Sequence, residues 1–249
     1  MAEARRRTIS GNEQSHPVWG VVGGMGPLAS AEFLKTIYES KICAGMKEQD
    51  APIIVLYSDP SFPDRTECFL RQDYEVLLSR LEGVLTKLNF CNVEGVIICC
   101  MTMHGILERL PDGLRRKVVS LVDVVFEDVL RDDRKHLLIC TEGSREMGVF
   151  ERHSMWADAR HRIVLPDDED QARLHQMIFQ IKTNCPKSQN EELSELLCKY
   201  QVSSFIAGCT EFHILVKQMA KIAGRDYQQF CIDPLMSIAR KLAHRSDPR

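Results

Sequence analysis

Two segments of the chain carry the same residue pattern around a cysteine that could act as an acid or a base. GVIICCMTMH and SFIAGCTEFH each run from an apolar stretch into a cysteine, with a threonine close behind and a histidine four residues after the cysteine. The cysteines are Cys100 and Cys209, and the histidines are His104 and His213. The two cysteines lie 109 positions apart in a chain of 249 residues. The pattern fits two interpretations equally well: an internal duplication, or a coincidence between two buried cysteines that end core strands.

Two opposed thiols suit the inversion of a stereocentre. Inversion removes a proton from one face of a carbon and returns one to the other, and a thiol with a pKa of about 8.5 serves as either base or acid. A helix that begins after each strand would stabilise a thiolate. The hydroxyls of Thr102, Thr141 and Thr210 are available donors for a carbanion-like state. No lysine has a distinctive context for a pyridoxal Schiff base, so we expect no cofactor.

Short apolar runs alternate with helical segments along the chain. We expect strands at 18–24, 51–59, 93–100, 118–123, 136–141, 161–166, 202–209 and 228–233. We expect helices that begin at Pro27, after Thr102 and at 142, and one that ends near Leu130. We expect further helices over 72–88, 167–182, 192–200, 211–223 and 234–244, and a loop at PSFPDRT. Continuous apolar strands separated by helices are typical of parallel sheets that are buried on both faces.

This alternation predicts an α/β protein with two pseudo-symmetric parallel-sheet halves. The active site would lie in the cleft between the halves, at the carboxyl ends of the strands, where such sheets bind ligands. Residues 1–17 would form a flexible N-terminal tail that includes three consecutive arginines, with an organelle-targeting role as the alternative. We predict a first α/β domain over 18–116 plus 222–249 and a second over 117–221.

Composition excludes several classes of function. The net charge is −3 and aromatic residues make up 7% of the chain, so neither a nucleic-acid partner nor a membrane partner is expected. No apolar run approaches the roughly 18 residues that span a bilayer, and a cytoplasmic protein is expected. None of the ten cysteines shows C-x-x-C spacing, so we expect no metal site. Most of these thiols should be reduced core residues.

Six motifs, in order, are similar to those of one enzyme family. They are GVVGGMGPLASAEF, SDPSFPDRT, CMTMH, CTEGSREMGVFE, LPDDEDQARLHQMIFQIK and AGCTEFHIL. Over roughly 18–244 the chain resembles the aspartate/glutamate racemase superfamily, most closely its aspartate racemase branch. The resemblance implies cofactor-independent racemisation of an acidic amino acid by a homodimer. The PDRT loop favours aspartate as the substrate, and glutamate stays open.

The resemblance also implies roles for individual residues. Cys209 would take the proton from the L-enantiomer and Cys100 from the D-enantiomer. Arg65 would hold the distal carboxylate, assisted by Lys182, although a solvated loop arginine and an exposed helix lysine are the alternatives. Further substrate-binding positions, for the α-carboxylate or the amino group, would be Gly24, Met101, Thr102, Thr141 and Thr210.

Two positions depart from the family pattern and three more have open roles. Met101 stands where the family usually has an asparagine, and a thioether cannot replace the amide donors. Ser144 replaces a threonine, which is a mild change. Glu211 could tune Cys209 or cap the next helix. His104 and His213 could simply pack near the helix starts.

Three other functions compete with racemisation. GMGPLA fits the G-x-G-x-x-A pattern of a dinucleotide site, but the acidic residue expected about 20 residues later is not clearly placed. Because Met101 alters the Cys100 motif, a one-cysteine decarboxylase or isomerase on the same fold is a second alternative. A non-catalytic binding protein derived from the fold is the third.

Overall fold

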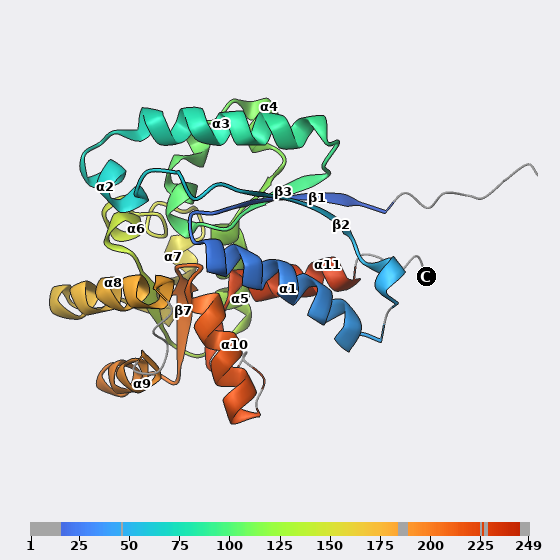
Figure 1. The fold of residues 1–249 in the computed structure, drawn as a ribbon. Coiled ribbons are helices and arrows are strands. Elements are labelled where there is room, and N and C mark those ends of the chain that lie inside the picture. The colour runs from blue at the N-terminus through green and yellow to red at the C-terminus, as the bar shows by residue number, and fades with distance from the viewer. Residues whose placement is uncertain (1–15, 46, 184–188, 225, 227–228, 245–249) are drawn as a thin grey trace, which may run out of the picture.

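The fold consists of two parallel four-stranded sheets with helices around them (Figure 1). A computed structural model describes residues 16–45, 47–183, 189–224, 226 and 229–244. The first sheet contains β1 (Val18–Gly23), β2 (Ile53–Ser58), β3 (Gly95–Ile98) and β4 (Val118–Val119), and the second contains β5 (His136–Cys140), β6 (Ile163–Val164), β7 (Ser204–Gly208) and β8 (Cys231–Ile232). The predicted α/β fold with two parallel-sheet halves is confirmed.

The two sheets repeat one topology. Their strand orders are β2-β1-β3-β4 and β6-β5-β7-β8, and every neighbouring pair is parallel. Strand β3 therefore occupies the same place in the first sheet as β7 does in the second. Cys100 follows β3 after one residue and Cys209 follows β7 directly, so the two cysteine motifs lie at equivalent strand ends.

Helices cover both sheets. Those that follow strands of the first sheet are α1 (Pro27–Cys43), α2 (Arg65–Leu70), α3 (Tyr74–Phe90), α4 (Asp112–Arg115) and α5 (Leu121–Arg131), with the 3₁₀ helices η1 (Glu48–Asp50) and η2 (Met101–Arg109). Those that follow strands of the second are α6 (Glu142–Glu146), α7 (Trp156–Ala159), α8 (Asp168–Lys182), α9 (Gln189–Lys199), α10 (Phe212–Ala223) and α11 (Pro234–His244), with η3 (Arg160–Arg162). In Figure 1, α3 lies above the first sheet, and α1 and α11 lie below it.

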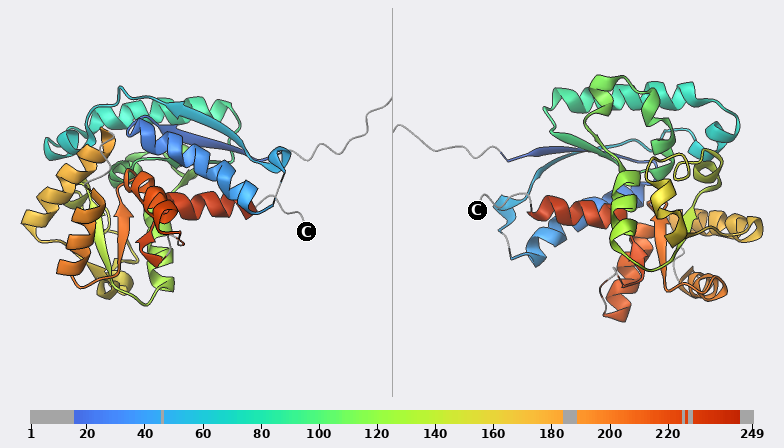
Figure 2. Two further views of the ribbon diagram at one scale, coloured as in Figure 1. Left: turned by 60° about the horizontal axis from the view of Figure 1, so that its bottom comes forward. Right: turned by 180° about the vertical axis from the view of Figure 1, so that it is seen from behind.

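The last helix joins the two halves. Helix α11 follows β8 of the second sheet but packs on α1 of the first half and on α5, and Figure 2 shows this C-terminal helix against the N-terminal one. Helix α5 follows β4 but contacts β8 and α7. Sheet pairing thus assigns β4 to the first half and β8 to the second, while α11 covers the first. The domain limits inferred from the sequence stay a prediction, and most of the proposed tail lies outside the described residues.

Alternate residues of the second sheet enter two hydrophobic clusters. Leu138 and Ile206 pack into the cluster that fills the first half, whereas Leu137 and Phe205 pack with α8, α9 and α10. Successive strand residues point to opposite faces, so each strand contributes to both clusters. One core therefore runs from the first half onto one face of the second sheet, which holds the two strand ends together.

Side-chain caps explain where the elements differ from those predicted. The strand expected at 118–123 is wrong beyond Val119, because the Ser120 hydroxyl accepts a hydrogen bond from the Asp123 amide and starts α5. The expected loop PSFPDRT contains the start of α2, which Asp64 caps by accepting from the Glu67 amide. Among the described residues, no helix combines the length and hydropathy needed to cross a membrane.

Candidate active site

The predicted site residues cluster at the carboxyl ends of the central strands. Gly24 follows β1, Cys100 follows β3, Thr141 follows β5 and Cys209 follows β7. These four strands form the middle of the two sheets, where parallel strands direct their carboxyl ends to one edge.

Hydrogen bonds connect the strand-end turns of the two halves. The Thr210 hydroxyl donates to the carbonyl oxygen of Cys99 at 3.2 Å. The hydroxyls of Thr102, Thr141 and Ser144 form a ring with oxygen–oxygen distances of 3.0–3.1 Å. Thr102 belongs to the first half and the other two to the second, so the Cys100 and Cys209 turns lie next to each other.

Glu211 pairs with Cys209. The buried Cys209 Sγ donates a hydrogen bond to Glu211 Oε2 at 2.8 Å. Glu211 is the N-terminal cap residue of α10, but its side chain makes no capping bond, so its contact is with the thiol and not with the helix. Burial and the nearby Glu211 carboxylate raise the pKa of Cys209 well above its ordinary value, and Lys182 opposes them. Cys209 therefore holds its proton at neutral pH.

Arg65 pairs with Cys100. Arg65 is the first residue of α2, and its guanidinium lies close enough to the Cys100 sulfur for the two groups to interact electrostatically. It also donates to the carbonyl oxygens of Met25 at 2.5 Å and Pro63 at 3.0 Å. Burial lowers the pKa of Arg65, but the negative charges of Cys100 and Asp64 more than compensate and raise it. The first cysteine thus has a fixed cation beside it.

A cavity of about 250 Å³ lies over these pairs. Its lining includes Gly24, Arg65, Lys182 and Glu211. Neither cysteine lines it. Cys100 lies next to the lining residue Arg65, and Cys209 lies next to the lining residue Glu211. Lys182 Nζ lies 3.9 Å from Glu211 Oε1. Arg65 Nε and Glu211 Oε1 are buried and have no hydrogen-bond partner among the described residues, which is expected where a polar ligand binds.

Two glycines make room at this cavity. Gly24 has φ = +90°, and a Cβ there would lie 2.3 Å from the backbone of Asp59. A Cβ on Gly26 would lie 2.3 Å from Glu211 Oε1. The glycine turn after β1 is therefore shaped by the close approach of the Glu211 carboxylate from the other half.

Other residues singled out from the sequence lie away from the cavity. Met101 is only 1% exposed and packs in the hydrophobic cluster of the first half. Burial lowers the pKa of His104 to about 4, so this histidine is neutral. His213 is fully buried and bonds Asp233 and Thr36. Sequence reasoning left the role of Glu211 open; its position two residues after Cys209 was the available signal.

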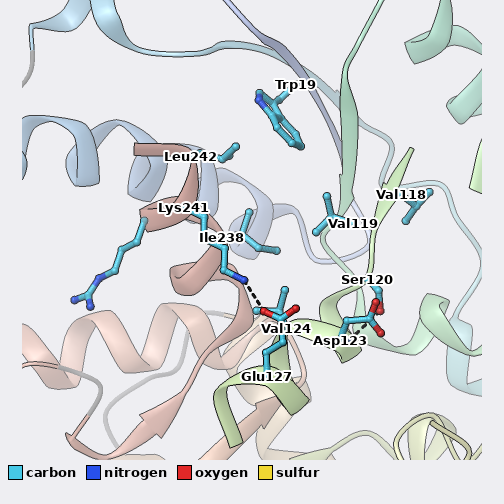
Figure 3. A pocket seen from close by; sticks show the side chains of 11 residues that line it. Trp19, Val118, Val119, Ser120, Asp123, Val124, Glu127, Ile238, Lys241 and Leu242 are labelled. Carbon is cyan, nitrogen blue, oxygen red and sulfur yellow. Dashed lines mark hydrogen bonds and ion pairs between the residues drawn. The ribbon is translucent and has the colours of Figure 1, made fainter. Parts of the chain in front are cut away.

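A larger cavity of about 810 Å³ lies elsewhere, between the first sheet, α5 and α11 (Figure 3). Trp19, Val119 and Leu242 line it, and within it Lys241 pairs with Glu127 at 2.9 Å. Neither Arg65 nor Glu211, the partners of the two cysteines, is among the residues that line it. Among the residues that the structure describes, no group of three or more His, Cys, Asp or Glu side chains is arranged to hold a metal ion.

Solved racemases share this fold. The aspartate racemase of Picrophilus torridus superimposes with a TM-score of 0.77 at 20% identity, covering 92% of this chain and 94% of the other. An aspartate racemase homologue from Pyrococcus horikoshii OT3 gives 0.64 at 22% identity (92% and 98% covered). The glutamate racemase of Campylobacter jejuni subsp. jejuni gives 0.56 at 18% identity (92% and 85% covered).

The sequence model of the Asp/Glu/hydantoin racemase family matches residues 22–242. This match spans both sheets and both cysteine turns. The predicted superfamily, and with it the enzyme class of racemases, is confirmed. The chain belongs to the Asp/Glu/hydantoin racemase family.

Proposed function

We propose that the protein racemises an acidic amino acid, with aspartate favoured, by a two-cysteine mechanism without a cofactor. The observation that carries this proposal is that two equivalent cysteines have unlike partners, Arg65 and Glu211, which both line one cavity. Cys100 contacts the Arg65 guanidinium, and Cys209 donates its proton to the Glu211 carboxylate. A two-base inversion needs one base and one acid at the start of each turnover, and these pairs supply them.

In the L-to-D direction, Cys209 first gives its proton to Glu211 and becomes a thiolate. The thiolate removes the α-proton, and the Cys100 thiol protonates the opposite face of the carbanion-like centre. The D-to-L direction starts from the Cys100 thiolate beside Arg65, with Cys209 as the acid. At the end of an L-to-D turnover, Cys209 holds the α-proton, Glu211 holds the original Cys209 proton and Cys100 is a thiolate. One proton must therefore pass from Glu211 to Cys100, through solvent, before the next L-to-D turnover.

The polar groups around the cysteines would hold the substrate. Arg65 would bind the distal carboxylate, and Lys182 would reach it from the other side of the cavity. Thr102, Thr141 and Thr210, with the backbone near Gly24, would bind the α-carboxylate or the amino group. A cavity of about 250 Å³ is near the lower end of the roughly 300–1,000 Å³ of typical ligand sites, a size that suits a single amino acid.

Proton NMR in D₂O tests the proposal. The protein is incubated with L-aspartate or L-glutamate, and loss of the α-proton signal and the change in chirality are followed together. We expect exchange and inversion without any added cofactor, faster for aspartate. No exchange with either amino acid would overturn the choice of substrate. Activity that depends on added pyridoxal phosphate would overturn the two-thiol mechanism, and release of CO₂ would favour a one-cysteine decarboxylase.

The homodimer and the cytoplasmic location are part of the same proposal. Both derive from the resemblance and the composition of the chain. Light scattering during size-exclusion chromatography measures the mass of the particle, and we expect twice the mass of the 28.4 kDa chain. A monomer at micromolar concentration would contradict the dimer without affecting the proposed chemistry.

A further inference from the structure

A buried polar cluster lies directly behind the Cys209 turn. It consists of His213 and Lys217 on α10, Thr36 on α1 and Asp233 at the start of α11, and we name it the α10 latch. Thr36, His213 and Asp233 are each at most 1% exposed. None of these side chains lines the candidate cavity, so the proposed chemistry leaves them unexplained.

Short hydrogen bonds run through the whole latch. His213 Nδ1 lies 2.6 Å from Asp233 Oδ2, and His213 Nε2 lies 2.8 Å from the Thr36 hydroxyl. Asp233 Oδ1 accepts from the backbone amide of Leu235 at 3.0 Å and so caps α11. Because Asp233 is acceptor-only when ionised, Nδ1 of His213 carries a proton.

Lys217 extends the latch toward the surface. Its ammonium donates to the Thr36 hydroxyl at 2.8 Å and pairs with Glu32 at 2.6 Å and Glu39 at 2.5 Å. Glu32, Thr36 and Glu39 all lie on α1, which belongs to the first half. The latch therefore ties α10 of the second half to α1 and to the start of α11 through groups that are hydrogen-bonded inside the protein.

The latch is continuous with the catalytic turn. The backbone amide of Phe212 donates to the carbonyl of Cys209, and that of His213 donates to the carbonyl of Thr210, each at 3.1 Å. Fixing the His213 ring therefore fixes the first turn of α10 and the residues just before it. On the same helix pair, Gly26 before α1 meets the Glu211 carboxylate.

We infer that the α10 latch positions the Cys209–Glu211 turn against the first half and so controls the Cys209 half of the reaction. The inference rests on the proposed function. These are positioning residues, since none of them touches the cavity. The Cys100 turn has no equivalent: no side chain among the described residues hydrogen-bonds the ring of His104, at the matching position, which interacts only with the Ile98 backbone of its own half. A disturbed latch should therefore affect one cysteine and spare the other.

Thr36→Val tests the inference with little change of shape, and Thr36→Ser is its matched control because it keeps the hydroxyl. In D₂O, we expect Thr36→Val to slow racemisation about tenfold in both directions, since the equilibrium constant between enantiomers is one and each turnover uses both cysteines. Exchange of the α-proton of the D-enantiomer without inversion, which needs Cys100 alone, should stay within about twofold of wild type. Thr36→Ser should restore the wild-type ratio of exchange to inversion.

A second measurement does not depend on activity. Alkylation of the native protein by iodoacetamide is followed at each cysteine by peptide mass spectrometry. We expect Thr36→Val to speed alkylation of Cys209 about tenfold and to leave Cys100 within twofold, with Thr36→Ser like wild type. Equal changes at both cysteines with an unchanged exchange-to-inversion ratio would show a merely structural role, and no change in either would also overturn the inference. A wild-type protein without racemase activity would defeat the proposed function, and the alkylation result would still decide on the latch.

Discussion

The two cysteine turns occupy equivalent places in the two sheets but have opposite electrical surroundings. Cys100 has the Arg65 cation beside it, and Cys209 has the Glu211 carboxylate. Behind the turns the contrast continues, since two side chains hydrogen-bond the His213 ring, whereas no described side chain hydrogen-bonds that of His104. A duplicated fold thus repeats the position of a sulfur, while loops and neighbouring helices decide which charged group lies beside it.

Replacing either cysteine should give the largest effect. Cys209→Ser and Cys100→Ser are each expected to lower racemisation by about 10³-fold, because a hydroxyl is a far weaker acid than a thiol and one proton transfer is lost. The two variants should differ in D₂O. Cys209→Ser should still exchange the α-proton of the D-enantiomer, and Cys100→Ser that of the L-enantiomer. Exchange of both enantiomers in either variant would refute the two-base assignment.

Arg65 should be the next most sensitive position. Arg65→Lys keeps the positive charge but loses the planar fork that pairs with a carboxylate, and we expect kcat/KM for aspartate to fall about 10²-fold. Arg65→Met should cost more than Arg65→Lys, because it also removes the cation beside Cys100. Steady-state kinetics with both enantiomers measures this. Two variants with equal kinetics would show that charge at position 65 does not matter.

Glu211→Gln should reduce the difference in charge between the surroundings of the two cysteines. The carboxylate raises the pKa of Cys209, so replacing it by a neutral amide should lower that pKa, and the thiolate should form at lower pH. The pH profile of Cys209 alkylation should then move to lower pH, with Cys100 as the internal reference. We expect kcat to fall about tenfold because the amide cannot accept the proton of Cys209. A profile unchanged by the substitution would remove Glu211 from the proposed mechanism.

Met101→Asn should have the smallest effect and concerns the Cys100 turn alone. The amide supplies a donor that the thioether lacks, but Met101 lies in an apolar cluster away from the cavity, so we expect kcat/KM for aspartate to stay within about twofold of wild type. Because Met101 is buried in an apolar cluster, the same change should lower the free energy of unfolding by about 1–3 kcal/mol. Kinetics and chemical denaturation measure the two effects. A clear rise in kcat/KM would show that residue 101 contacts the substrate after all.

Most of the fold follows from local sequence signals. The strands expected at 18–24, 51–59 and 202–209 are observed within a few residues of those limits, since continuous apolar runs between helices leave little choice. The errors arise where a single side chain ends a pattern. Ser120 starts α5 inside an apolar run, and Asp64 starts α2 inside a segment with two prolines.

Less of the candidate site could be predicted from the sequence. Residue types and strand-end positions suffice to select Cys100, Cys209 and Arg65. The bond from Cys209 to Glu211 was one of two local choices, because a carboxylate two residues after a thiol can also cap a helix. The hydrogen bonds of His213 could not be predicted from the sequence, since Thr36 lies 177 positions away in the chain. Long-range pairing of polar groups depends on helix packing that no local pattern records.

The position of α11 in the chain affects how the protein folds during its synthesis. This helix covers α1, which leaves the ribosome well before α11 does. Until α11 is made, the face of α1 that it covers stays exposed to solvent. The first half therefore cannot bury this face before the second half has been synthesised. A chain truncated before α11 should therefore keep this face of α1 exposed. We expect such a chain to aggregate, although it contains every strand of both sheets.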